Sequence, residues 1–153
     1  MVISGGNNRS MFFGEYNHKI DAKGRVIIPN EFRDELADAC VISKGLDGCL
    51  YIYPNSEWET VLENLSKLPS NAKSRSIVRF FTAGAYQVET DAMGRILIKN
   101  ELRSYAGITK EVVFAGAKNR IEVWDKAKYE EIINVDNIEG LVDEMAEEFG
   151  LSI

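Results

Sequence analysis

Short apolar segments and tight turns alternate over the first third of the chain, which is the pattern of β-strands and hairpins. Strands are predicted at residues 12–20, 25–28, 41–44 and 50–53. Asp21 and Gly24 favour a turn between the first two, because Asp bonds its own downstream backbone and Gly accepts a positive φ. Pro29 ends the second strand and opens a helix over residues 30–39, since a first helical turn does not use the N–H that proline lacks.

Helical spacing replaces this alternation in the next segment. Apolar side chains recur at helical intervals at Trp58, Val61, Leu62 and Leu65. The preceding Ser56-Glu57-Trp58-Glu59 has the form of a capping box, so the helix is expected to start there and to end at Pro69. Ser70 is expected to cap another helix that reaches about Phe81. No Gly- or Ser-rich linker follows, which favours one fused unit over two separate domains.

The same order of elements then returns. The segment from Gly14 to Arg33 recurs 70 residues later from Gly84 to Arg103, and residues 41–53 recur as 112–124. Such a repeat predicts two related halves, each too small for a comfortable core of its own, that share one core. The expected division is a disordered extension at 1–10, a first repeat with its connecting helices at 11–81, a second repeat at 82–133 and an acidic amphipathic tail at 134–153.

Charge is unevenly distributed along the chain. The net charge is −6, from 18 basic and 24 acidic residues, but eight of the acidic residues follow Lys128 and no basic residue does. The body therefore has a slight positive excess, and the stretch from Asn64 to Val88 holds four basic residues and no acidic one. An acidic tail on a near-neutral body with basic patches is compatible with a nucleic-acid partner.

No apolar stretch approaches the roughly 20 residues of a membrane span, and residues 1–10 lack the apolar run of a signal peptide. Cys40 and Cys49 are expected to be buried apolar residues in a reducing compartment, not a disulfide or a metal pair. These features predict a cytoplasmic protein with no membrane partner.

Catalytic and metal-binding motifs are missing from the sequence. His18 is the only histidine, and no C-x-x-C, Gly-x-Ser-x-Gly, Walker A or Gly-x-Gly-x-x-Gly motif occurs. A site built from carboxylates alone is left open, although the acidic residues are scattered on expected helix surfaces. We therefore expect no enzyme, no catalytic residue, no metal, no cofactor and no small-molecule substrate.

The repeated Asp-Ala-x-Gly-Arg turn is the strongest candidate for function. It occurs at residues 21–25 and again at 91–95. A structural interpretation has the Asp cap the turn, the Gly permit it and the Arg pair with the Asp. A functional interpretation has the Arg contact phosphate or guanine, since its planar fork suits both and a two-stranded ribbon fits the major groove. On the second interpretation Lys19, Lys23, Arg25 and Arg95 bind DNA, while Asp21, Gly24, Asp91 and Gly94 shape the turns.

An ordered series of motifs resembles the bacterial MraZ family between residues 11 and 133. They are Phe12-Phe13-Gly14-Glu15-Tyr16, Asp21-Ala22-Lys23-Gly24-Arg25, Gly45-Leu46-Asp47-Gly48-Cys49-Leu50, Tyr53-Pro54 with Glu57-Trp58, and Asn119-Arg120-Ile121-Glu122-Val123-Trp124. The resemblance implies a mixed β fold with helices, in which two tandem swapped-hairpin half-domains of the AbrB, SpoVT and MazE type form a double-split β-barrel flanked by helices. The swap would occur within one chain.

The resemblance also implies a function. Members of the family regulate transcription at the promoter of the division and cell-wall gene cluster, associate into rings and bind short G-rich direct repeats. The expected role is thus a nucleoid-associated, DNA-binding regulator, expected to be a repressor that also acts on its own promoter. The family's basic turn residues fall on Lys23, Arg25 and Arg95, but Met93 stands at the position of Lys23 in the second copy. The alternative is an antitoxin-like module that binds a protein partner.

The tail has two interpretations that the sequence leaves open. Its apolar residues Ile138, Leu141, Val142, Met145 and Phe149 recur at helical spacing, and Gly150 is a suitable terminator. This stripe can dock on its own domain, the interpretation that we favour, or contact a neighbouring subunit while the acidic face limits non-specific DNA binding.

Overall fold

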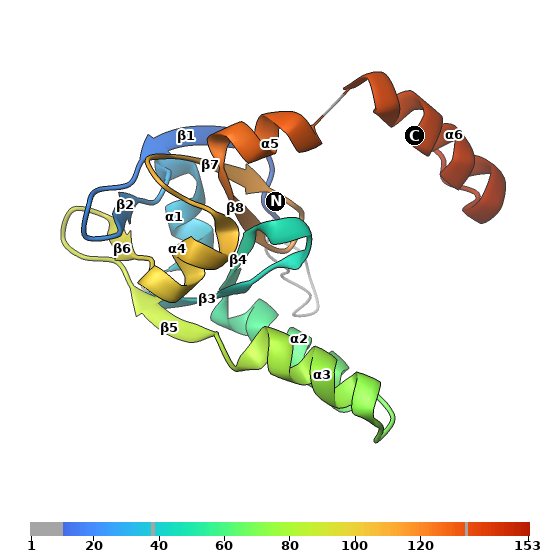
Figure 1. Ribbon diagram of the computed structural model, residues 1–153, viewed down its shortest axis with the longest axis horizontal. Coiled ribbons are helices and arrows are strands. Elements are labelled where there is room, and N and C mark those ends of the chain that lie inside the picture. Colours follow the sequence, from blue (N-terminus) through green and yellow to red (C-terminus); the bar gives the residue numbers. More distant parts are fainter. Residues whose placement is uncertain (1–10, 38, 134) are drawn as a thin grey trace.

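The computed structural model describes residues 11–37, 39–133 and 135–153. Its first half contains β1 (Glu15–Lys19), β2 (Arg25–Ile27), α1 (Asn30–Leu36), β3 (Ala39–Lys44), the 3-10 turn η1 (Leu46–Gly48) and β4 (Leu50–Pro54), followed by α2 (Asn55–Ser66) and α3 (Ala72–Thr82). Its second half contains β5 (Tyr86–Glu89), β6 (Arg95–Leu97), α4 (Asn100–Ala106), β7 (Glu111–Gly116), β8 (Ile121–Asp125) and α5 (Lys126–Ile132), and α6 (Val135–Phe149) ends the chain (Figure 1). The expected disordered extension at 1–10 lies outside the described residues.

The two halves exchange their first hairpins. Six antiparallel strands form one sheet in the order β1-β7-β8-β4-β3-β5, so β1 pairs with a strand of the second half and β5 with a strand of the first. The short strands β2 and β6 pair with each other in a separate ribbon. The swap within one chain is confirmed, and so is the mixed fold with a mostly antiparallel sheet. The sheet is open, with β1 and β5 at its edges, so the double-split barrel is not confirmed.

One large core is shared between the halves. Val26, Ile28 and Phe32 from the first half lie in the same buried cluster as Ile96, Ile98 and Leu102, which occupy the equivalent positions of the second. Burial of these side chains is the main favourable term in folding, and each half supplies surface that the other covers. A smaller cluster around Tyr51, Tyr53 and Trp124 attaches α2 and α3 to the sheet through Trp58, Val61 and Phe81.

Two expected elements are shorter than predicted. β1 starts at Glu15, because Gly14 has a φ of 93° that bends the chain, and Phe12 makes an isolated bridge with Lys118. α1 ends at Leu36 instead of residue 39, because Ala37 leaves the helix with a φ of 60°. Sequence periodicity does not reveal such boundaries, since the apolar pattern continues across both of them.

The two predicted helix caps are wrong. α2 begins at Asn55 directly after Pro54, with no side-chain cap, so Ser56 lies inside the first turn. Pro54 already has a φ of −58°, which suits a helix start and lets β4 run straight into α2. α3 is capped by Asn71, whose side chain accepts a hydrogen bond from the Ser74 N–H at 2.8 Å, and not by Ser70.

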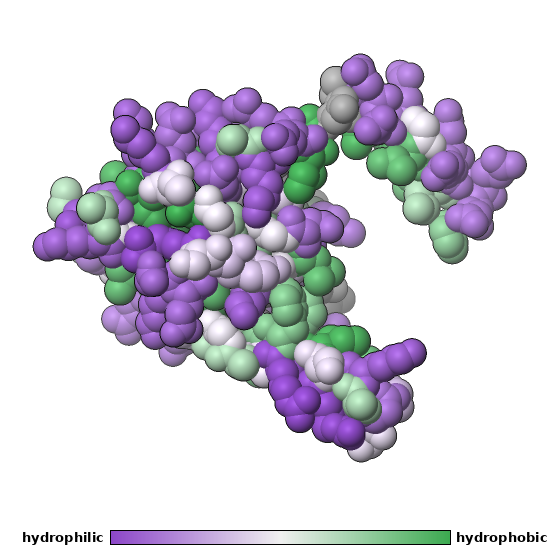
Figure 2. Space-filling view, viewed as in Figure 1, coloured by the Kyte–Doolittle hydropathy of each residue, from purple (hydrophilic) through white to green (hydrophobic). Residues whose placement is uncertain are grey.

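The acidic tail forms the helix α6, which extends away from the body (Figure 1). The expectation that it docks on its own domain is wrong. Every described side chain in it is exposed except Val142, which is half-buried. Apolar side chains gather along one side of α6 and hydrophilic ones along the other (Figure 2). Gly150, with a φ of 72°, ends the helix as predicted. Among the described residues no helix has the length and apolar character needed to cross a membrane.

Candidate nucleic-acid interface

The first Asp-Ala-x-Gly-Arg turn is organised by the Asp21 carboxylate. Its Oδ1 accepts hydrogen bonds from the backbone N–H groups of Lys23 and Arg25, at 3.0 and 2.8 Å, and its Oδ2 accepts one from Arg25 Nε at 2.8 Å. These bonds, the Arg25 backbone N–H first among them, lower the pKa of Asp21 below its ordinary value of 3.8. The carboxylate is therefore ionised at neutral pH and holds the Arg25 side chain by one nitrogen.

The second turn repeats this geometry bond for bond. Asp91 Oδ1 accepts from the N–H groups of Met93 and Arg95, and its Oδ2 accepts from Arg95 Nε, all at 2.9 Å. The pKa of Asp91 is likewise lowered, chiefly by the backbone N–H of Arg95. Both parts of the structural interpretation are thus present, since each Asp caps its turn and pairs with its Arg.

The pairing leaves most of each guanidinium available. Asp21 and Asp91 engage only Nε, and among the described residues no hydrogen bond from the terminal nitrogens of Arg25 or Arg95 is found. The Arg25 side chain is 38% exposed and that of Arg95 is 25% exposed. An arginine anchored through Nε is oriented in advance, so its Nη groups can donate to phosphate oxygens or to guanine O6 and N7 with little loss of freedom.

The β2–β6 ribbon brings both arginines to one surface. Val26 pairs with Ile96 in the middle of the ribbon, and both side chains are buried. Because side chains alternate along a strand, Arg25 and Arg95 point to the opposite, outer face. They stand diagonally across the ribbon, roughly 7 Å apart at Cβ, which is within the roughly 12 Å width of a major groove.

Each turn is closed by the other half of the chain. The Gly24 carbonyl accepts a hydrogen bond from Ile98 N–H at 2.8 Å, and the Gly94 carbonyl accepts one from Ile28 N–H at 3.0 Å. Both glycines are buried and have positive φ values of 89° and 77°. The two candidate DNA-binding loops are therefore fixed to one another through the swapped hairpins.

Two arginines without a predicted role complete this arrangement. Arg33 of α1 lies with its guanidinium against Gly94, and Arg103 of α4 lies against Gly24. Their Nε atoms donate to the carbonyls of Ile28 and Ile98, at 3.1 and 2.9 Å. Sequence reasoning assigned them nothing, although their equivalent places in the repeat, 70 residues apart, were a usable signal.

The remaining predicted residues lie at the edges of this surface. Lys23 is exposed at the tip of the first turn, where the second turn carries the exposed, apolar Met93. Lys19 is exposed at the end of β1, opposite Glu111 of β7, so a carboxylate-bearing residue faces it across the sheet. The first turn thus presents Lys23 and Arg25 together, while the second presents Arg95 alone.

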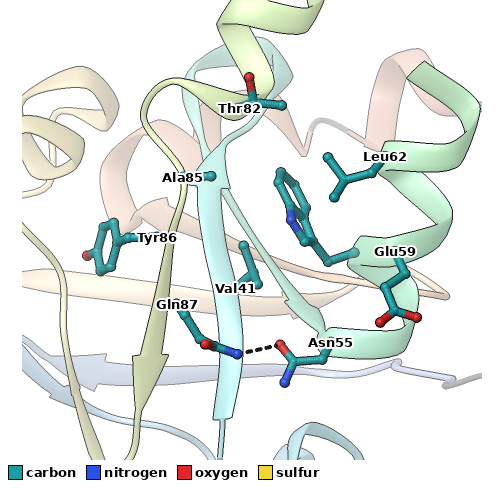
Figure 3. A pocket seen from close by; sticks show the side chains of 9 residues that line it. Val41, Asn55, Glu59, Leu62, Thr82, Ala85, Tyr86 and Gln87 are labelled. Atoms are coloured by element: carbon teal, nitrogen blue, oxygen red, sulfur yellow. Dashed lines mark hydrogen bonds between the residues drawn. The ribbon is translucent and has the colours of Figure 1, made fainter. Parts of the chain in front are cut away.

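The groove beside α2 holds few groups suited to catalysis. This groove of about 540 Å³ lies between α2 and β5, where Glu59 and Leu62 lie across from Val41 and Gln87 (Figure 3), and Trp58 also lines it. Its one carboxylate belongs to Glu59, and no histidine or cysteine lines it. Within the ranges that the structure describes, no three His, Cys, Asp or Glu side chains gather into a possible metal site.

Both cysteines are free and buried, as expected. Burial raises the pKa of each thiol to about 12, so the reactive thiolate is scarce at neutral pH. Neither residue belongs to the surface formed by the turns.

Comparison with known proteins decides the family. The family described as "MraZ protein, putative antitoxin-like" matches residues 11–81 and again residues 80–150. The chain belongs to the MraZ family. Proteins named "Transcriptional regulator MraZ" from Lachnoclostridium phytofermentans and Pediococcus pentosaceus are 50% and 51% identical over 142 and 140 residues. These alignments cover 93% and 87% of this chain and 99% and 98% of the relatives.

A third MraZ relative, from Clostridium tetani, is 47% identical over 140 residues, which cover 90% of this chain and 98% of the relative. The two matches of the MraZ family to one chain correspond to its two halves and confirm the resemblance inferred from the motifs. MraZ proteins are named as regulators of transcription, so the family is not one of enzymes, as the missing catalytic motifs predicted.

Proposed function

We propose that this MraZ-family protein is a DNA-binding regulator of transcription that contacts its operator through the two Asp-Ala-x-Gly-Arg turns. The observation that carries the proposal is the pre-oriented pair Arg25 and Arg95 on the outer face of one ribbon, each held by its Asp partner through Nε alone. The relatives' name as transcriptional regulators supports the same role.

In this proposal the two turns contribute unequally to DNA binding. Arg25 reads a base in the major groove, where a bidentate arginine selects guanine, and Lys23 contacts a neighbouring phosphate. Arg95 adds a second contact, without the lysine that supports the first. Lys19 is more distant from DNA in this arrangement and contributes through its charge. Asp21, Gly24, Asp91 and Gly94 hold the two loops in shape.

We further propose that several copies act together on DNA. One protomer offers three cationic side chains at its turns and carries an overall charge of −6, which is little for a specific site. Association of protomers in a closed ring raises the effective concentration of turns along the DNA. Direct repeats about one helical turn, roughly 10 bp, apart would place successive protomers on one face of the duplex.

The proposed targets follow the resemblance described from the motifs. They are short G-rich direct repeats upstream of the division and cell-wall gene cluster, including this protein's own promoter, where binding represses transcription. A guanine-rich site suits a surface whose main base-reading groups are arginines. Such a protein acts at the nucleoid, in the cytoplasm.

Binding to the DNA upstream of the protein's own gene tests this proposal. In a fluorescence anisotropy titration, Arg25→Ala should weaken specific binding by about 1–3 kcal/mol for each base that Arg25 reads. The matched control is Lys118→Ala, which removes an exposed cation bridged to Phe12, at the end of β1 opposite to the first turn, and should leave the affinity unchanged. Unchanged affinity in Arg25→Ala would instead assign Arg25 a purely structural role.

A second candidate, an antitoxin-like module that binds a protein partner, is favoured by the words "antitoxin-like" in the family description. The dependence of binding affinity on salt concentration distinguishes the two candidate functions. DNA binding releases counterions and weakens steeply with salt, by a slope of about 0.9 for each phosphate contact. A protein–protein contact made by the exposed apolar side chains of Ile27, Met93 and Leu97 would depend on salt only weakly.

A further inference from the structure

We propose that α6 of one chain docks into the groove between α2 and α3 of a second copy of the same chain. This inference rests on the self-association proposed above and identifies the surfaces that make it. The groove is lined by apolar side chains, among them Leu46, Val61, Leu65, Leu68, Ile77 and Phe81, and by Arg120.

The helix α6 has the features of a docking element without a partner in its own chain. Ile138, Leu141, Met145 and Phe149 are 43%, 50%, 41% and 75% exposed, although they lie along one side of the helix. A stripe of this kind is normally buried against another element. Since α6 extends away from the body, its own chain leaves the stripe uncovered (Figure 1).

The groove between α2 and α3 offers a matching apolar surface. Its volume is about 370 Å³, and exposed Leu46, Leu68 and Ile77 contribute to its wall. Its α2 side runs from Val61 to Leu65, roughly 6 Å of helix, and Leu68 extends it beyond the end of α2, so the groove accommodates about one turn of a second helix. Leu141 and Met145 of α6 are one turn apart and fit such a length.

Charge selects α6 as the occupant. α6 carries acidic residues on its polar side and no basic residue, whereas the segment from Asn64 to Val88 carries four basic residues and no acidic one. Arg75 and Arg79 on α3 are exposed and line a neighbouring hollow that shares Leu65 and Leu68 with the groove. An acidic amphipathic helix therefore finds apolar contact flanked by opposite charge, which favours this partner over neutral or basic helices.

Arg120 adds a specific attraction within the groove. Its Nε is buried and has no hydrogen-bond partner among the described residues. Its Nη2 reaches Tyr51 Oη and Glu122 Oε2 only at 3.5 Å, and the guanidinium lies 4.1 Å from the centre of the Tyr51 ring. A guanidinium with so few short bonds can donate hydrogen bonds to a carboxylate from the acidic side of an incoming helix.

The groove on the other side of α2 is a poorer acceptor. Glu59 lines it and would repel an acidic helix, and its Asn55 and Gln87 side chains already hydrogen-bond to each other at 3.1 Å (Figure 3). The two grooves share no lining residue, so substitutions can separate them.

Docking of a helix into a different surface of the next copy is a head-to-tail contact. Such contacts close into rings when the rotation per copy allows it and otherwise continue as filaments. The α6–groove contact therefore supplies a repeating interface that leaves the two turns of every copy exposed.

Matched substitutions, measured by sedimentation of the full chain without DNA, test the docking. Met145→Asp on α6 and Ile77→Asp in the groove should each reduce the assembly to single chains of 17.2 kDa. Leu62→Asp, which lines only the other groove at similar exposure, and Ile153→Asp, which lies beyond α6, should leave the mass unchanged. An assembly that survives both Met145→Asp and Ile77→Asp would overturn the docking but not the self-association.

Disulfide trapping identifies the partner directly. Chains with Met145→Cys mixed with chains with Ile77→Cys should form a linked pair, and the buried native cysteines should stay unreacted. A link within single chains that carry both substitutions, links only between two Met145→Cys chains, or no link at all would each overturn the proposal. A wild-type chain that sediments as a monomer would overturn both the docking and the ring, whereas the effect of Arg25→Ala on DNA binding tests the proposed function independently.

Discussion

The turn at residues 21–25 and the turn at residues 91–95 have the same backbone conformation but different surroundings. Both Asp carboxylates make the same three hydrogen bonds, with lengths that agree within about 0.1 Å. The first turn, however, presents Lys23 beside an Arg25 side chain that is 38% exposed. The second presents Met93 beside an Arg95 side chain that is 25% exposed. The framework was thus retained in both copies while the contact surface diverged.

The difference extends to the glycines. A Cβ at Gly24 would lie 2.6 Å from the Ile98 carbonyl oxygen, which is backbone held in the ribbon and cannot move away. The three atoms nearest to a Cβ at Gly94 all belong to the guanidinium of Arg33, the far end of a flexible side chain. The first turn is therefore the more rigidly enclosed of the two, as well as the more strongly charged.

Substitution of the glycines gives the largest expected difference between the turns. Gly24→Ala should lower the free energy of unfolding by about 2–4 kcal/mol, because a positive φ and a clash with backbone add together. Gly94→Ala should lower it by about 1–2 kcal/mol, because the positive φ is unavoidable while the nearest clash is with the Arg33 guanidinium, which can move. Denaturant unfolding of both variants measures the two values.

Gly140→Ala serves as the control, since a Cβ at this helical glycine meets nothing within 4 Å and has no positive φ to oppose it. If Gly24→Ala and Gly94→Ala lower the free energy of unfolding equally, the surroundings of the two glycines do not differ in stiffness.

The sequence was a good guide to what the repeat determines. The equivalence of Asp21 with Asp91 and of Arg25 with Arg95 is visible as identical letters, and the structure gives these residues identical bonds. The shared core was also predicted, because two small halves need one core between them. The exchange of hairpins was implied by the resemblance to the MraZ family and not by pattern or size.

Other features depend on tertiary contacts that the amino-acid sequence alone does not reveal. Arg33 and Arg103 close the turns of the opposite half, and only the swapped topology brings them there. The capping box at Ser56 failed because Pro54 lets β4 continue directly into α2. The predicted docking of α6 on its own domain was wrong because an apolar stripe indicates that a helix has a partner but does not identify that partner.

Exchange of the residues at the tips of the turns should give an intermediate effect. Lys23→Met makes the first turn resemble the second, and Met93→Lys makes the second resemble the first. Each phosphate contact contributes a slope of about 0.9 to the dependence of log affinity on log salt, so it changes the affinity ratio between about 50 and 200 mM salt by roughly 3.5-fold. Lys23→Met should reduce this ratio, and Met93→Lys should increase it, by that factor for each engaged protomer.

Anisotropy titrations over the same range of salt measure both variants against Lys118→Met, which removes one charge from an exposed lysine at the end of β1 opposite to the first turn, as a control for net charge. If Met93→Lys leaves the salt slope unchanged while Lys23→Met flattens it, the second turn does not reach the phosphates, and the two turns differ in position as well as in charge.

Neutralisation of the capping carboxylates should have the smallest effect, and here the two turns should behave alike. The folded-state pKa of Asp21 and of Asp91 lies below the ordinary value of 3.8, so each carboxylate stabilises the fold above that pH and loses its contribution as the pH falls through the folded-state value. Asp21→Asn and Asp91→Asn should therefore each lower stability at neutral pH and flatten its decline as the pH falls below the ordinary carboxylate pKa of 3.8. Denaturant midpoints measured across this fall in pH, with Asp143→Asn on exposed α6 as the control, should show two variants of equal slope. A flatter decline in only one variant would mean that the turns differ in their electrostatics as well as in their exposed side chains, despite their equal bonds.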